Sequence, residues 1–217
     1  MERNFLGEME RLKAESLAMM YMAQTALRKA FQAVRERDRE LALEVMEGDA
    51  EIDRLECAMD VEALRLLALQ QPVARDLRFI IGCMRLAGNV ERVGDEAVNI
   101  ADHCVILLER PPLIPPQSLD TLAGMAADLL GKAVTAFNGG ATALAREVLE
   151  AIPGVTALHY LLFKEMTEIM LAESRTVERA VQLSFIAHSL RRICDQAANI
   201  SETVIFIVEG VNAKHRC

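Results

Sequence analysis

Two pairs of acidic residues in the N-terminal half have the spacing of metal ligands on helices. Asp49 and Asp53 form one pair, and Glu91 and Asp95 form the other. Residues four apart share one helix face. The turns around Glu91 and Asp95 are apolar, so these carboxylates are expected to face a core, where they need a partner such as a cation. Oxygen ligands suit Fe, Mn, Mg, Ca or Zn, and the pattern predicts a carboxylate-rich, multinuclear metal site.

An interpretation without metal fits the same spacing. At about 100° per residue, one sector of roughly 60° holds four acids, namely Asp49, Asp53, Glu56 and Asp60. Asp49 alone could cap a helix, and the remaining carboxylates could pair with nearby arginines. These arginines are Arg54, Arg85 and Arg92.

The segment that carries Glu91 and Asp95 recurs 100 residues later. "VERVGDEAVNIADH" (90–103) matches "LRRICDQAANISET" (190–203), so Asp95 corresponds to Asp195 and Glu91 to Arg191. A guanidinium therefore stands where the first copy has a carboxylate. We predict an Arg191–Asp195 ion pair in the second copy.

The partner helix of the second copy has lost its acids as well. "DAEIDRL" (49–55) lines up with "IPGVTAL" (152–158), which puts Ile152 and Thr156 at the two acidic positions. A mononuclear zinc-type site of His159, His188 and Asp195 is the alternative to the ion pair.

The elements that carry these residues are predicted to be helices throughout. Apolar residues recur at three- and four-residue spacing, and the composition favours helices. We expect two copies of a three-helix antiparallel unit, each with a short extra helix that ends at Gly48 or before Pro153. The expected helices span 6–34, 41–47, 49–71, 73–109, 119–137, 141–151, 153–171 and 174–210.

A proline-rich linker divides the chain near its midpoint. "RPPLIPPQS" (110–118) holds four prolines in six residues and cannot be helical. The predicted domains are therefore a first three-helix bundle at 1–110, a linker at 111–118 and a second three-helix bundle at 119–217.

Composition and charge exclude several classes of function. A net charge of −8 argues against nucleic acid as a ligand. No signal peptide and no apolar run of membrane-spanning length is visible, so we expect a cytoplasmic protein that does not insert into a membrane. The five cysteines form no C-x-x-C pair, and the four in helical segments are expected to be buried thiols. No Glu-x-x-His pair, phosphate loop or hydrolase motif appears, so no enzyme is predicted.

Two long strings resemble the PhoU family of phosphate-uptake regulators. They are "QPVARDLR" (71–78) and "ERVGDEAVNIA" (91–101), and the resemblance extends over essentially the whole chain. It implies two tandem three-helix bundles in an all-α protein. It also implies multinuclear clusters of Fe or Zn, with Mn or Mg also proposed, bound at E/D-x-x-x-D motifs.

The family motif maps onto particular positions of this chain. The main ligands would be Asp49, Asp53, Glu91 and Asp95, with a weaker expectation for Asn99 and Asp102. The second bundle keeps a degraded set of Asp195, Asn199 and Glu202.

The resemblance also implies a function and partners. Such proteins are non-enzymatic negative regulators of the phosphate-starvation response, and we expect a homodimer. The expected partners are the ATPase subunit of the phosphate ABC importer and a sensor histidine kinase. Two alternatives stay open: a helical interaction module without functional metal, and a carboxylate-bridged metal oxidase.

Overall fold

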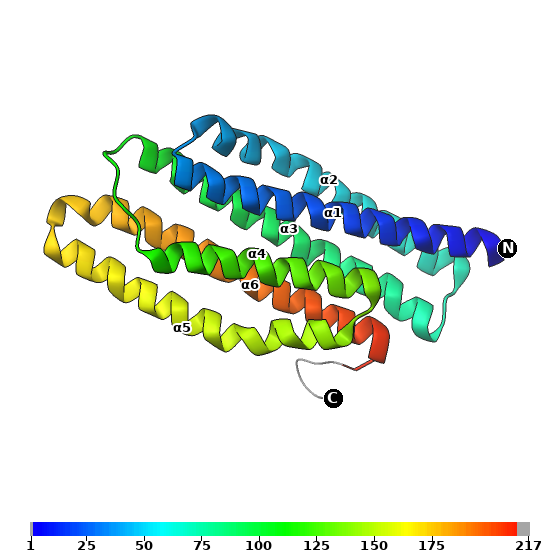
Figure 1. The fold of residues 1–217 in the computed structure, drawn as a ribbon. Coiled ribbons are helices and arrows are strands. Elements are labelled where there is room, and N and C mark those ends of the chain that lie inside the picture. The colour runs from blue at the N-terminus through cyan, green and yellow to red at the C-terminus, as the bar shows by residue number, and fades with distance from the viewer. Residues whose placement is uncertain (1, 212–217) are drawn as a thin grey trace.

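Long helices account for nearly all of the computed structural model, which describes residues 2–211 (Figure 1). No strand occurs within these residues, so the predicted all-α class is confirmed. In chain order the elements are α1 (Glu2–Glu36), α2 (Arg39–Gln70), α3 (Ala74–Leu108), α4 (Gln117–Gly139), α5 (Thr142–Ala172), the short 3₁₀ turn η1 (Ser174–Thr176) and α6 (Val177–Glu209).

Helices α3 and α6 form the centre of the molecule. α3 packs against α1 and α2 of its own half, α6 packs against α4 and α5, and the two central helices pack against each other (Figure 1). Each central helix therefore has neighbours on several sides, which explains why it is apolar around much of its circumference. The two three-helix units form one continuous core along α3 and α6.

The two central helices run antiparallel and are related by the sequence repeat. A Cβ added at Gly82 would lie 3.6 Å from Thr203 Cγ2. Shifted by 100 residues, this contact becomes the one between Gln182 and His103, whose Oε1 and Nδ1 are 2.6 Å apart. The ion pair of Glu96 with Arg192 lies between these two contacts. Residues in the 90s of α3 therefore cross residues in the 190s of α6 near the middle of the molecule.

The helix ends follow local rules. Asp38 caps α2, with its Oδ1 accepting a hydrogen bond from the Leu41 backbone N–H at 3.0 Å. Pro72 lies between α2 and α3, as predicted. Gly140 and Gly210 end α4 and α6 with φ of 63° and 75°, a conformation that glycine adopts without strain.

The predicted short helix before Gly48 is wrong, because α2 continues through this glycine. A glycine inside a helix costs about 1 kcal/mol relative to alanine. Val45 and Ile52 flank Gly48 and are both buried on the face that packs against the bundle. Burying each contributes roughly 1.5–3 kcal/mol, which outweighs the glycine. Asp49 is consequently inside a helix and does not cap one.

The same reason removes the expected break at Pro153. α5 continues from Thr142 to Ala172, although a proline inside a helix costs about 3 kcal/mol. Pro153 is exposed, whereas Val148 and Val155 on either side are fully buried. α4 also begins at Gln117, two residues earlier than the expected helix.

Three of the four cysteines that were expected to be buried are buried. Cys83, Cys104 and Cys194 are buried as predicted, but Cys57 is exposed because it lies on the outward face of α2. Within residues 2–211, no helix has the length and apolar character needed to cross a membrane.

Candidate metal centre

Asp49 on α2 lies directly against α3 at Gly94. A Cβ added to Gly94 would be 2.8 Å from Asp49 Oδ1 and 3.1 Å from Ile52 Cδ1. Real Cβ atoms do not approach an oxygen so closely, so the glycine is what allows the carboxylate to reach the α3 backbone. This contact places the Asp49–Asp53 pair beside the Glu91–Asp95 pair.

Asp49 Oδ1 is buried and has no hydrogen-bond partner among the described residues. Leaving a buried polar atom without a hydrogen-bond partner costs about 1–3 kcal/mol, and more when the group is charged. The position is thus incomplete without a hydrogen-bond donor or a cation.

The carboxylates of this cluster act on one another electrostatically. Burial, followed by the negative charges of Asp53 and Asp95, raises the pKa of Asp49. Burial and the charges of Asp95, Glu56 and Asp53 raise the pKa of Glu91 to about 6. The four predicted residues therefore share one electrostatic environment.

The pKa of Asp95 is raised as well. Burial is the main cause, and the charges of Asp53 and Glu96 add to it. A hydrogen bond with Glu91 and the positive charge of Arg192 oppose part of this rise. A bound cation would relieve the repulsion that all three shifts report.

Glu56 joins this cluster although it was not among the predicted ligands. A Cβ at Gly88 would be 3.7 Å from Glu56 Oε1, and Glu56 contributes to the raised pKa of Glu91. Its place in the acidic sector of α2 was the signal that could have included it. The side chains are near one another but do not converge: within residues 2–211, no three His, Cys, Asp or Glu side chains form a group already arranged to hold a metal ion.

The weaker candidates are engaged differently. The Asn99 amide donates a hydrogen bond to Glu96 Oε2 at 3.3 Å, and Asp102 is exposed further along α3. Glu96 itself is buried and accepts a 2.8 Å bond from Arg192 Nε of α6. Asn99 thus supports the ion pair that joins the two halves.

The second half contains a different arrangement at the corresponding place. Arg191 Nη2 lies 3.6 Å from Asp195 Oδ2, which confirms the predicted ion pair. The rings of His159 and His188 have centroids 6.1 Å apart, and neither they nor Asp195 belong to a ready metal-binding group in the described residues. Burial, and then the positive charges of Arg191 and His188, lower the pKa of His159.

The other two candidates of the second half do not join Asp195 in a site. The Asn199 amide donates to Gln196 Oε1 at 3.1 Å. Glu202 lies half-buried, two turns beyond Asp195 on α6. The carboxylate-rich cluster is thus a property of the first half.

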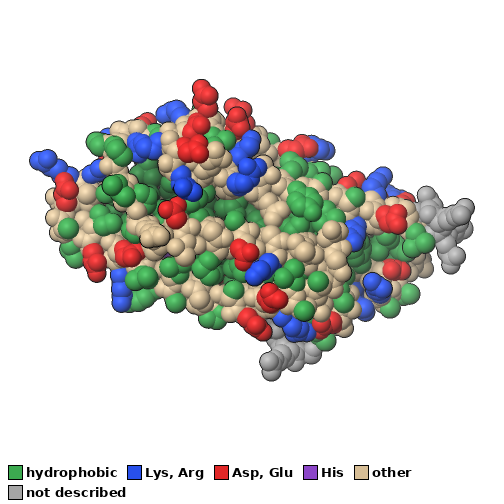
Figure 2. All heavy atoms as spheres, in the orientation of Figure 1, with side chains coloured by type: hydrophobic (Ala, Val, Ile, Leu, Met, Phe, Trp, Pro, Cys, Tyr) green, Lys and Arg blue, Asp and Glu red, His purple; other side chains and the backbone are tan. Residues whose placement is uncertain are grey.

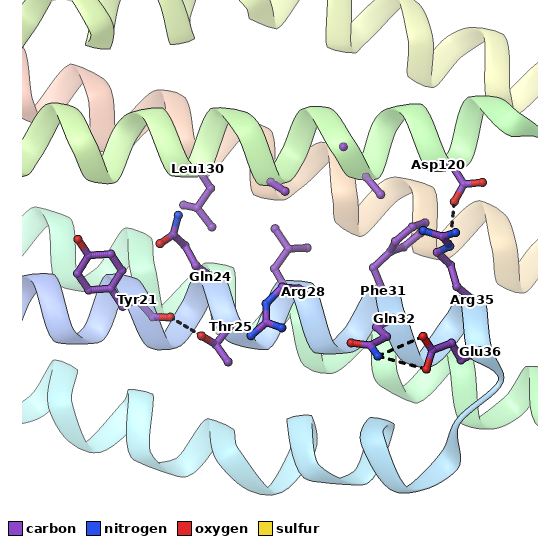
Figure 3. Close-up of a pocket in the computed structure, with 14 residues that line it drawn as sticks. Tyr21, Gln24, Thr25, Arg28, Phe31, Gln32, Arg35, Glu36, Asp120 and Leu130 are labelled. Carbon is purple, nitrogen blue, oxygen red and sulfur yellow. Dashed lines mark hydrogen bonds and ion pairs between the residues drawn. The ribbon is translucent and has the colours of Figure 1, made fainter.

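A groove of about 850 Å³ runs between α1 and α4, away from these clusters. It is visible as a hollow with apolar lining in Figure 2, and Figure 3 shows its side chains. Some of its polar groups pair with one another: Arg35 Nε lies 3.7 Å from Asp120 Oδ1, and the Gln32 amide donates to Glu36. None of the acidic residues of α2 or α3 lines it.

Nearly the whole chain is similar in sequence and structure to one group of known proteins. The family model described as "PhoU domain" matches residues 17–104 and again 119–204, one match in each helical half. The "phosphate-specific transport system accessory protein PhoU homolog" of Aquifex aeolicus is 36% identical over 209 residues, covering 96% of this chain and 95% of that protein. A protein of the same description from Xylella fastidiosa (strain Temecula1) is 33% identical, covering 96% and 86%.

Two solved structures are similar to this chain over nearly its whole length. PhoU from Pseudomonas aeruginosa superimposes with a TM-score of 0.92 at 30% identity, covering 95% of this chain and all of that one. The phosphate transport system regulatory protein PhoU from Streptococcus pneumoniae gives a TM-score of 0.90 at 25% identity, covering 96% and 99%.

Proposed function

Because this chain belongs to the PhoU family, we propose that it is a regulatory accessory protein of phosphate uptake. The observation that carries the proposal is the match over nearly the full length of both proteins, at 36% identity, with an accessory protein of a phosphate-specific transport system. Relatives are described as accessory or regulatory proteins. A regulatory role without catalysis fits these descriptions.

The proposed role is inhibitory and involves two partner proteins. The protein restrains the phosphate-starvation response when phosphate is plentiful, from the cytoplasm and as a homodimer. It does so by contacting the ATPase subunit of the phosphate ABC importer and a sensor histidine kinase. The long helices and continuous core supply a stiff scaffold with exposed faces on which such proteins could dock.

Deletion of the gene tests the regulatory role. A reporter driven by a phosphate-starvation promoter should become active in phosphate-rich medium and fall again when the wild-type gene is restored. A reporter that stays silent after deletion would contradict the proposal. Co-purification of the tagged protein with the importer ATPase, with an unrelated ABC ATPase as control, tests the partner separately.

We further propose that the first half binds metal at Asp49, Asp53, Glu91 and Asp95, with Fe or Zn as the first candidates and Mn or Mg as others. The support is the unpaired, buried Asp49 Oδ1 and the raised pKa values of Asp49, Glu91 and Asp95. Two helices supply all four residues, so the bound ions would join α2 to α3. What the metal supplies is positive charge that neutralises the repulsion between the carboxylates.

Elemental analysis tests the metal separately from the regulation. The protein, loaded with Fe, Mn or Zn and then desalted, should retain at least one ion per chain, and Asp95→Ala should lower that content. Glu150→Ala is the matched control, because Glu150 is an exposed acid on α5, in the other half of the chain. Less than about a tenth of an ion per chain after loading would leave the second candidate, an interaction module without metal.

That second candidate has an observation in its favour, since the four carboxylates do not form a group arranged to hold a metal ion in the described residues. The third candidate, a metal oxidase, predicts oxygen consumption by the metal-loaded protein. A flat oxygen trace would rule against it.

A further inference from the structure

The second half carries basic side chains at the place that corresponds to the proposed metal centre of the first half. The 100-residue offset that relates the contacts of α3 and α6 places Arg191 where the first half has Glu91. On α5, His159 stands opposite Glu56 of the first half, and Ile152 and Thr156 replace two aspartates. Where the first half gathers carboxylates, the second gathers nitrogen donors.

Arg191 is left with an unused donor. Its Nε is buried and has no hydrogen-bond partner among the described residues. The nearest acidic group, Asp195, lies 3.6 Å from Nη2, which is an ion-pair distance beyond hydrogen-bonding reach. The Arg191 side chain is 34% exposed, and a guanidinium presents Nε and an adjacent Nη as a fixed fork, so an acceptor with two oxygens fits the unsatisfied Nε together with that Nη.

Two imidazoles, the half-buried His159 and the exposed His188, lie on the same side of α5 and α6 as this guanidinium. His188, Arg191 and Asp195 stand three and four residues apart and share one face of α6, while His159 approaches from α5. The two imidazole rings are 6.1 Å apart, and Arg191, His188 and Asp195 all act electrostatically on His159. Each imidazole carries an N–H that can donate a hydrogen bond.

We propose that Arg191, His159, His188 and Asp195 form a binding site for a protonated tetrahedral oxyanion of the phosphate class. Arg191 donates from Nε and an Nη to two oxygens, and the imidazoles donate to the others. Asp195 accepts a hydrogen bond from the hydroxyl of the anion. This acceptor makes the site selective, because hydrogen phosphate has a proton to donate and sulfate at neutral pH has none.

The charge pattern opposes a cation at this place. A metal would lie beside a permanently charged guanidinium, and three of the four carboxylates of the first half are absent here. The site is separate from the proposed metal centre, and phosphate regulation as proposed above does not require it. Metal content and anion binding can therefore succeed or fail independently.

The test is equilibrium binding of radiolabelled inorganic phosphate to the full chain in chelator, so that bound metal cannot hold the anion. The wild-type protein should bind, and unlabelled phosphate should compete far better than sulfate. Arg191→Gln should weaken binding by about ten- to a hundredfold, the effect of losing hydrogen bonds to a charged group. Arg28→Gln is the matched control, because Arg28 is an exposed arginine on the far groove between α1 and α4.

A second substitution tests selectivity and guards against misfolding. Asp195→Asn should keep the fold, as measured by helical circular dichroism, and should reduce the preference for phosphate over sulfate by about tenfold. No phosphate binding by the wild-type protein at millimolar concentration would overturn the proposal. So would equal binding by wild type and Arg191→Gln, or equal competition by sulfate and phosphate.

Discussion

The raised pKa of Glu91 predicts that this residue destabilises the metal-free protein at neutral pH. Its pKa moves from an ordinary 4.5 to about 6 in the folded state. An acid whose folded pKa exceeds its unfolded value is more protonated when folded between these two pH values. The free energy of unfolding therefore falls as the pH rises through this window and stays lower above it.

The size of the effect follows from the shift. A change of about 1.5 units corresponds to roughly 2 kcal/mol. The side chain is partly open to solvent, which screens the repulsion, so we take about 1 kcal/mol as the expected effect. Glu91→Gln removes the charge and should stabilise the metal-free protein by that amount near pH 8. For a chain of this length, this corresponds to a melting temperature higher by about 2–4 °C.

Thermal unfolding in chelator, followed by circular dichroism, measures this directly. The gain should be present near pH 8 and should largely vanish near pH 4.5, where the wild-type carboxyl is protonated. Glu150→Gln, which removes an exposed acid of α5, should show no such dependence on pH. If Glu91→Gln is less stable than wild type near pH 8, or if its gain is equal at both pH values, the carboxylates do not repel one another as the structure indicates.

Three further predictions follow from the contacts of Asp95, Gly94 and Arg192, with Gly124→Ala as the control for Gly94→Ala. Asp95→Ala should lower the melting temperature in metal-replete buffer and change it little in chelator; equal shifts in both buffers would count against the site. Gly94→Ala drives a Cβ into the facing carboxylate, a clash of about 1–3 kcal/mol that exceeds the gain of alanine in a helix, so the variant should be less stable and its metal content should fall. Gly124→Ala, which meets open space on α4, should instead stabilise by about 0.5–1 kcal/mol, and denaturant unfolding compares the two. Arg192→Gln should cost about 1–2 kcal/mol by leaving the buried Glu96 carboxylate without its charged partner, and a loss below 0.3 kcal/mol in denaturant unfolding would contradict this.

The helices and their order were predictable because they depend on local signals. These signals are the apolar periodicity and the prolines that end helices, at Pro72 and in the 110–118 linker. The two failures, at Gly48 and Pro153, have one cause. A helix-breaking residue costs about 1–3 kcal/mol, and the buried apolar neighbours that flank it within five residues supply more than that. Burial of those neighbours depends on packing between helices, which cannot be predicted from the local sequence.

The sequence predicted which residues belong to the candidate site, but not how their side chains are arranged in space. Spacing on a helix selected the Asp49–Asp53 and Glu91–Asp95 pairs without any tertiary information. The approach of Asp49 to the α3 backbone depends on where two helices cross, which spacing does not determine. The same holds for the link between Glu96 and Arg192, since it joins residues from separate halves of the chain.

Comparison of the two halves indicates that Gly94 makes room for the side chains of α2, Asp49 nearest and Ile52 next, and is not required for the packing of α3 against α6. The repeat places Cys194 at the corresponding position of α6, where its side chain is fully buried in a well-packed core. A Cβ at this position is therefore compatible with the fold. It is incompatible with a carboxylate approaching from the neighbouring helix, and the second half has no such carboxylate, because Ile152 stands in place of Asp49. Glycine is retained where an acid must reach the central helix, and a larger residue fills the space where that acid has been lost.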